Sequence, residues 1–80
     1  MRASAYILIT AIAGKVREVM DQITELREVS HVDAVLGPYD LIVTLTGADY
    51  HKIGRLIIEK IHSIPGVERT VTCNVIDFEE

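Results

Sequence analysis

Apolar residues along the chain switch between a strand-like and a helix-like spacing. Residues 5–12 are almost all apolar, which predicts a strand buried on both faces. After Gly14 the apolar positions recur every three or four residues, the spacing of one helical face. These positions are Val16, Val19, Met20, Ile23 and Leu26. The first third of the chain therefore predicts a strand followed by an amphipathic helix that begins near Lys15.

The remaining chain predicts three more strands and a second helix. Two apolar runs, 32–36 and 41–45, flank a Gly-Pro turn and predict an antiparallel hairpin that ends at Gly47. Asp49 is a suitable helix cap, and Pro65-Gly66 cannot continue a helix. Between them, helical spacing joins Ile53, Leu56, Ile57, Ile61 and Ile64. Residues 67–78 alternate polar and apolar, which predicts a last strand.

The two halves of the chain match each other, and this match predicts the fold. Leu26 and Val29 have counterparts 35 positions later in Ile61 and Ile64. The order is strand–helix–strand, twice, and right-handed crossovers place the first and third strands at the centre. We therefore expect an α+β, ferredoxin-like plait of order βαββαβ. Its four-stranded antiparallel sheet would carry both helices on one face.

The sheet face without helices is expected to join two copies of the chain. If Leu41 and Val43 face the helices, the alternation turns other side chains away from them. The residues expected there are Ile42, Thr44, Thr46, Thr70, Thr72, Asn74, Ile76 and Phe78. A face of Thr and apolar side chains suits sheet-to-sheet packing better than exposure to water. We therefore expect a dimer through the sheet, as in a dimeric α+β barrel.

Composition narrows the class of protein. Eighty residues predict one domain over 1–80, and 49% apolar residues exceed what one thin core easily hides. No apolar run reaches the length of a membrane span, and a formal charge of −4 argues against direct nucleic-acid binding. The single Cys73 cannot form an internal disulfide, and the start of the chain lacks a convincing signal-peptide cleavage site. These features favour a cytoplasmic protein.

The hairpin turn and the final strand together carry a resemblance to a known family. The sequence Val35-Leu36-Gly37-Pro38-Tyr39-Asp40-Leu41-Ile42-Val43, and Val67-Glu68-Arg69-Thr70-Val71-Thr72 after Ile64-Pro65-Gly66, resemble the RAM domain of the leucine-responsive, or Lrp/AsnC, regulators. The resemblance covers essentially the whole chain. It implies a face-to-face dimer that assembles into a ring, commonly an octamer of four dimers. It also implies a free amino acid as effector, bound between dimers.

The family's glycine-turn motif maps onto Gly37, Tyr39 and Asp40, and its chemistry suits a zwitterion. Backbone N–H groups near Gly37 can receive a carboxylate, and Asp40 can accept a hydrogen bond from an ammonium group. Pro38 belongs to the same expected ligand-binding site. Tyr39 offers an apolar wall and one hydroxyl. Thr70 and Thr72 are weaker candidates for the same ligand-binding site. Asp40 can alternatively cap the turn or hold it rigid.

The resemblance is to stand-alone RAM proteins, since no helix-turn-helix DNA-binding domain precedes the first strand in this sequence. Regulation of transcription would then pass through a partner such as a full-length Lrp/AsnC regulator. Two alternatives stay open: a purely structural oligomerisation module, and a small enzyme of the dimeric α+β barrel class. Against an enzyme, the chain has no Trp, and its histidines match no metal-ligand spacing. We expect no catalytic residue, no metal and no cofactor.

Overall fold

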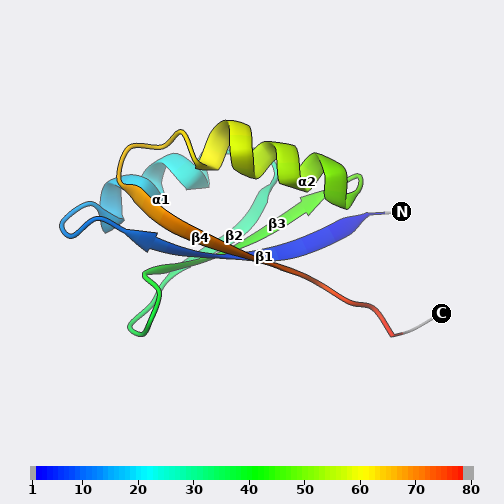
Figure 1. Ribbon diagram of the computed structural model, residues 1–80, viewed down its shortest axis with the longest axis horizontal. Coiled ribbons are helices and arrows are strands. Elements are labelled where there is room, and N and C mark those ends of the chain that lie inside the picture. Colours follow the sequence, from blue (N-terminus) through cyan, green and yellow to red (C-terminus); the bar gives the residue numbers. More distant parts are fainter. Residues whose placement is uncertain (1, 79–80) are drawn as a thin grey trace.

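The computed structural model describes residues 2–78 as one four-stranded sheet with a single layer of helices on one face (Figure 1). The first half contains β1 (Ala3–Ala11), α1 (Val16–Thr24) and β2 (Val29–Ala34). The second half contains β3 (Leu41–Gly47), α2 (Tyr50–Leu56), its π-helical continuation η1 (Ile57–Ile61) and β4 (Val67–Asn74). The order of elements is the βαββαβ order that the sequence predicts.

All strand pairs are antiparallel, and the sheet order is β2-β3-β1-β4. The first and third strands are central, as the crossover argument predicts. In Figure 1, α1, α2 and η1 lie above the sheet, and residues 2–78 place no helix below it. The ferredoxin-like plait is therefore confirmed.

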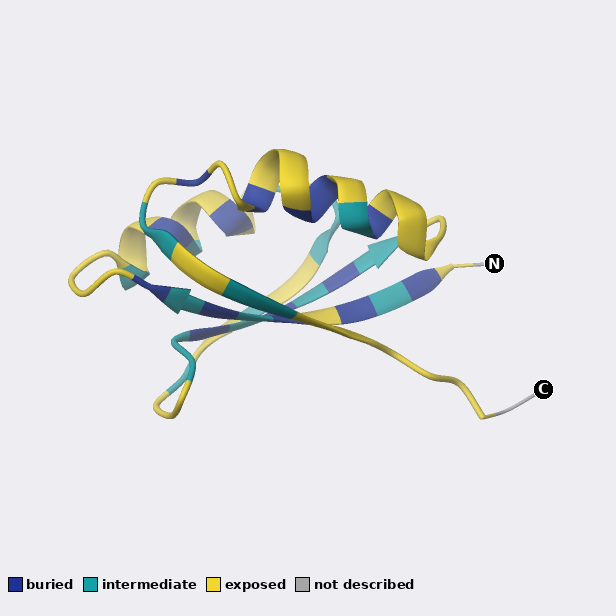
Figure 2. Ribbon diagram, viewed as in Figure 1, coloured by how far each residue is buried: buried dark blue, intermediate teal, exposed yellow. Residues whose placement is uncertain are grey.

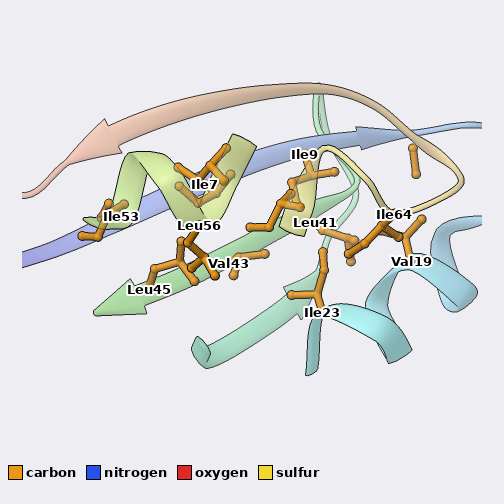
Figure 3. Packing of buried hydrophobic residues seen from close by; sticks show 14 of the residues in the cluster. Ile7, Ile9, Val19, Ile23, Leu41, Val43, Leu45, Ile53, Leu56 and Ile64 are labelled. Carbon is orange, nitrogen blue, oxygen red and sulfur yellow. The ribbon is translucent and has the colours of Figure 1, made fainter. Parts of the chain in front are cut away.

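The core lies between the two central strands and the helices (Figure 3). On β1 and β3 every second residue is buried, beginning with Ala3 and Leu41. Each fully buried Ile or Leu side chain stabilises the fold by roughly 1.5–3 kcal/mol relative to an exposed one. The largest fully buried side chains are Ile7, Ile9, Val19, Ile23, Leu41, Val43, Leu45 and Ile61.

The expectation that the first strand is buried on both faces is wrong for a single chain. Tyr6 is 47% exposed and Leu8 is half-buried, because they point away from the helices. A nearly continuous apolar run thus has one face in the core and one face on the surface. Both faces of β1 could be buried only if another layer of protein packed on the side of the sheet without helices.

The Asp49 cap and the Pro65-Gly66 turn lie at the two ends of the second helical segment, as the sequence predicts. The Asp49 carboxylate accepts a hydrogen bond from the Lys52 backbone N–H (2.8 Å), which is the N-cap that the sequence predicts. After η1, the chain turns through Pro65 and Gly66. Gly66 has a φ of +102°, in the region that glycine adopts without strain.

Two strand boundaries differ from the sequence expectation. β2 begins at Val29, not at residue 32, and ends at Ala34, so residues 35–40 form a longer connection than a tight turn. The early start follows from a turn in which the Val29 N–H bonds to the Leu26 carbonyl. β4 ends at Asn74, and Ile76 and Phe78 lie in an exposed tail (Figure 2).

The pairing of β4 corrects the side-chain assignment of the last strand. Thr72 lies opposite Ile7, and Thr70 opposite Ile9, both of which are core residues. Directly paired side chains share a face of the sheet, so Thr70, Thr72 and Asn74 lie on the helix side. Their expected position on the bare face is therefore wrong.

The face without helices, called the open face below, is formed by different residues. Leu8 lies at its centre, paired with Ile42 on one side and Val71 on the other. Ile42, Thr44 and Thr46 are on this face, as predicted. The open face comprises Ser4, Tyr6, Leu8, Thr10, Ile42, Thr44, Thr46, Val71 and Cys73, together with the flanking His31, Asp33 and Arg69.

Candidate functional site

The connection between β2 and β3, residues 35–40, projects from the sheet on the side away from the helices (Figure 1). A hydrogen bond from the Val35 N–H to the Asp40 carbonyl (3.0 Å) closes its base. Leu36, Gly37 and Pro38 at its tip are exposed (Figure 2). Polar and apolar groups at this tip are thus available to another molecule.

Asp40 fixes this connection to the neighbouring strand. Its backbone N–H donates to the Ile9 carbonyl (2.8 Å), and its Oδ2 accepts from the Ala11 N–H (2.8 Å). The second bond satisfies a backbone donor at the point where the β1–β4 register shifts, between Thr10 and Ala11. The structure therefore places Asp40 in the rigidifying role, one of the two roles that the sequence left open. Its Oδ1 makes no hydrogen bond within residues 2–78.

Tyr39 is half-buried beside Asp40, and no hydrogen bond to its hydroxyl occurs within the described part of the chain. Gly37 has an ordinary backbone conformation, and an added Cβ would meet nothing within 4 Å. Its lack of a side chain is not needed by this chain's own packing. The Tyr39 hydroxyl and the surface around Gly37 are therefore the available parts of the motif.

The structure does not bring Thr70 and Thr72 to this connection. Both line a groove of about 320 Å³ between β4 and the α2–η1 helix, on the opposite side of the sheet. There the Thr70 hydroxyl lies 2.9 Å from His62 Nε2, and the Tyr50 hydroxyl donates to the Val75 carbonyl (2.6 Å). Within one chain, these threonines belong to a different surface from Tyr39.

Sequence reasoning missed His62 and Tyr50 as members of that groove. The missed signal is the Pro65-Gly66 turn, which folds β4 back beside the helix and brings residue 62 next to residue 70. With this reversal in view, a histidine one helical turn before the Pro would be expected near the start of β4.

Replacing Asp40 with Asn tests its structural role. Asn keeps a carbonyl oxygen for the Ala11 N–H but loses the charge, so we expect unfolding to become easier by about 0.5–1.5 kcal/mol. Asp40→Ala leaves the N–H without its partner and should cost more, about 1–3 kcal/mol. Urea denaturation would measure the free energy of unfolding of both variants. Equal stability of Asp40→Ala and the unmodified protein would contradict the role.

Across residues 2–78, no three His, Cys, Asp or Glu side chains come close enough together to hold a metal ion. In the same part of the chain, no helix is long and apolar enough to cross a bilayer.

Comparison with known proteins gives a consistent picture. A family model described as the Lrp/AsnC ligand binding domain matches residues 4–78. The uncharacterised HTH-type transcriptional regulator PYRAB01370 of Pyrococcus abyssi is 35% identical over 68 residues. That match covers 85% of this chain and 43% of the regulator, so the chain spans less than half the length of this relative.

Solved structures share the fold over nearly the whole chain. The crystal structure of FFRP-DM1 has a TM-score of 0.88 at 36% identity, covering 92% of this chain and 99% of that one. The transcriptional regulator NMB0573 of Neisseria meningitidis, solved as an L-Met complex, has a TM-score of 0.85 at 19% identity. It covers 98% of this chain and 52% of that one, and at this identity the likeness concerns the fold alone.

Proposed function

Because this chain belongs to the Lrp/AsnC ligand-binding domain family, we propose that it binds a free amino acid as an effector and couples that binding to assembly. The observation that carries the proposal is the connection at residues 35–40. It is fixed at its base by Asp40 and presents the Tyr39 hydroxyl, for which residues 2–78 provide no hydrogen-bond partner. The L-Met complex of the Neisseria regulator supports an amino acid as the ligand class.

The proposed ligand contacts use the polar groups of residues 35–40 that make no hydrogen bond within residues 2–78. Asp40 Oδ2 is engaged by the Ala11 N–H, which leaves Oδ1 to accept from a ligand ammonium group. The Tyr39 hydroxyl and the backbone around Gly37 and Pro38 would meet the carboxylate. Exposure of the tip leaves room for contacts from a second dimer, so we place the effector between dimers.

Assembly begins, in this proposal, with two open faces packed against each other. The face combines Leu8, Ile42 and Val71 with hydroxyl side chains and few charges, a composition suited to a sheet-to-sheet contact. Dimers then join into a ring, which we propose to be an octamer. An effector held between dimers shifts this equilibrium because separated dimers offer only part of its contacts.

The wider role proposed here is regulatory. The chain would modulate amino-acid-responsive transcription in the cytoplasm through a full-length Lrp/AsnC regulator, without catalysis, cofactor or direct contact with DNA. The net charge of −4 supports the absence of DNA contact. The open face equally favours a purely structural oligomerisation module, which would share the assembly but lack the effector.

A thermal scan against the twenty common amino acids tests the effector. A selective ligand at a hundred times its dissociation constant stabilises the native state by about 2.7 kcal/mol, which corresponds to a rise of roughly 10–20 °C in a domain of this size. Tyr39→Phe removes one hydrogen bond to the ligand carboxylate, worth about 1.5–3 kcal/mol, so calorimetry should show affinity weaker by roughly 10- to 150-fold.

Tyr6→Phe is the matched control, because it makes the same chemical change on the open face, away from the connection. Its affinity for the amino acid should be unchanged. If no amino acid raises the melting temperature, the structural module replaces the sensor. If Tyr39→Phe binds with full affinity, the hydroxyl is not a ligand contact.

A further inference from the structure

The outer edge of β4 carries backbone groups that the chain itself does not pair. β4 pairs only with β1, and the Val75 N–H donates to the Ser4 carbonyl (2.9 Å), which directs the odd-numbered residues toward β1. Backbone groups alternate in direction along a strand, so those of Thr70, Thr72 and Asn74 point away from β1. In the described part of the chain, no other element forms a backbone hydrogen bond with these three residues. β4 therefore ends the sheet with a row of unpaired donors and acceptors.

This edge lacks the protection that the other edge of the sheet has. β2 is interrupted by a register shift between Val29 and His31, and it carries the charged Asp33. Residues 70–76 contain no charged side chain and no proline, and five of the seven are β-branched. The register shift between β1 and β4 lies before residue 69, outside this stretch. Natural edge strands avoid association through charges, prolines, bulges or short length, so the β4 edge is suited to pairing with another strand.

A groove runs beside this edge on the helix side of the sheet. It is the groove of about 320 Å³ that Thr70 and Thr72 share with α2 and η1. Its helical wall includes the exposed Ile58, and Gly54, where an added Cβ would meet nothing within 4 Å. His62 lines the end of the groove beside Thr70. A strand added to β4 would direct every second side chain into this groove.

The tail that follows β4 carries apolar side chains that the described residues leave exposed. Ile76 is 72% exposed and Phe78 is 90% exposed, and the tail extends past the end of the sheet (Figure 2). Continued in the alternation of β4, residues 76 and 78 have the same orientation as Thr72. Their backbone groups then point to the free edge, and their side chains stand on the helix side of the sheet. The tail thus matches the edge in backbone direction and the groove in chemistry.

We propose that β4 and its tail pair with the same segment of a second copy, antiparallel and two-fold, with Asn74 opposite its own copy. In this register Ile76 of the second copy lies opposite Thr72, and Phe78 of the second copy lies opposite Thr70. Directly opposite residues share a face of the sheet, so both apolar side chains enter the groove of the first chain. The two-fold axis fills the second groove in the same way, and the two sheets continue as one.

The same register brings opposite charges together on the other face of the sheet. Asp77 of the second copy lies diagonally across from Arg69, at a spacing that long side chains can bridge. Within residues 2–78, Arg69 makes no ion pair. The charges of the tail and of β4 are therefore complementary in the register that also fills the groove.

The size of this contact suits the joining of dimers. Two tails and two grooves bury on the order of 1,000 Å², with about 150–250 Å² from each aromatic side chain, which is the lower limit for a specific contact. A contact of this size is weak between single chains. It joins open-face dimers through a second two-fold contact, for which it rests on the dimer of the proposed function, and it does not involve Tyr39.

Amide hydrogen exchange of the whole protein, followed by NMR, tests the pairing. The Thr72 N–H gains a partner only in the paired edge, whereas the Cys73 N–H points toward β1 in every state. Ile76→Lys places an ammonium group in the groove, so the Thr72 amide should exchange faster by about tenfold or more than in the unmodified protein. The Cys73 amide should exchange at the same rate in both proteins. Sedimentation velocity should show that assembly of Ile76→Lys stops at the dimer.

Ile12→Lys is the matched control, since Ile12 is 50% exposed, follows β1 and does not line the groove. It should leave the exchange rate of Thr72 unchanged. Unprotected exchange of Thr72 in the unmodified protein would overturn the proposal. Protection of Thr72 that persists in Ile76→Lys would also overturn it, because a different segment would then cover the edge. Protection that Ile76→Lys removes, in a protein that responds to no amino acid, would eliminate the effector and retain this contact.

Discussion

Leu8→Lys is expected to dissociate the proposed assembly into single chains. Leu8 lies at the centre of the open face, between Ile42 and Val71, so an ammonium group there would be buried against the second sheet. Burial of an unpaired charge costs several kcal/mol, and every 1.4 kcal/mol weakens association tenfold. The dimer dissociation constant should rise by about a thousandfold or more. Sedimentation velocity at micromolar concentration would measure it.

Thr72→Lys provides the control on the same sheet. Thr72 is exposed and lies on the helix side, opposite Ile7, so a lysine there should leave the dimer intact. Circular dichroism of both variants checks that the fold survives. Dissociation by Thr72→Lys with an intact Leu8→Lys dimer would place the interface on the helix side and contradict the sheet-to-sheet proposal.

Gly66→Ala is expected to be the most destabilising small substitution. Gly66 has a φ of +102°, and an added Cβ would lie 2.9 Å from Val19 Cγ2 and 3.1 Å from Lys15 Cβ. Backbone strain and overpacking each cost about 1–3 kcal/mol. Together they cost about 2–6 kcal/mol, which should lower the melting temperature by about 10 °C or more for a domain of this size.

Substitutions at two other glycines distinguish the effect of backbone strain from the effect of overpacking. Gly14 has a φ of +83° but nothing within 4 Å of an added Cβ, so Gly14→Ala should show the backbone strain alone. Gly54, inside α2, also has nothing nearby, and Gly54→Ala should stabilise the helix by about 0.5–1 kcal/mol. Scanning calorimetry of the three variants would rank their melting temperatures. A Gly66→Ala protein as stable as Gly14→Ala would contradict the close packing at residue 66.

Sequence periodicity predicted the fold because each helix has one clear apolar face, and because glycine, proline or a cap marks the breaks other than the one between α1 and β2. It failed for the last strand. The open face is itself apolar, so Val71 and Cys73 point there while Thr70 and Thr72 face the helix. When both faces of a sheet carry apolar residues, alternation no longer tells which face is the core.

The candidate site was predictable only in part. The turn motif located Tyr39 and Asp40, but the bond from the Ala11 N–H to Asp40 joins positions 29 residues apart. No local pattern predicts such a contact.

The position of β1 in the sheet has a consequence for synthesis of the protein. Both of its neighbours, β3 and β4, come later in the chain. A nascent polypeptide therefore exposes its apolar first strand until residue 74 has been made, which takes about 3–13 s at 5–20 residues per second. Both edges of β1 are bare until residue 47 completes β3, and the edge that pairs with β4 stays bare until residue 74. Chaperones that hold extended apolar segments near the ribosome exit would find their target at residues 3–11.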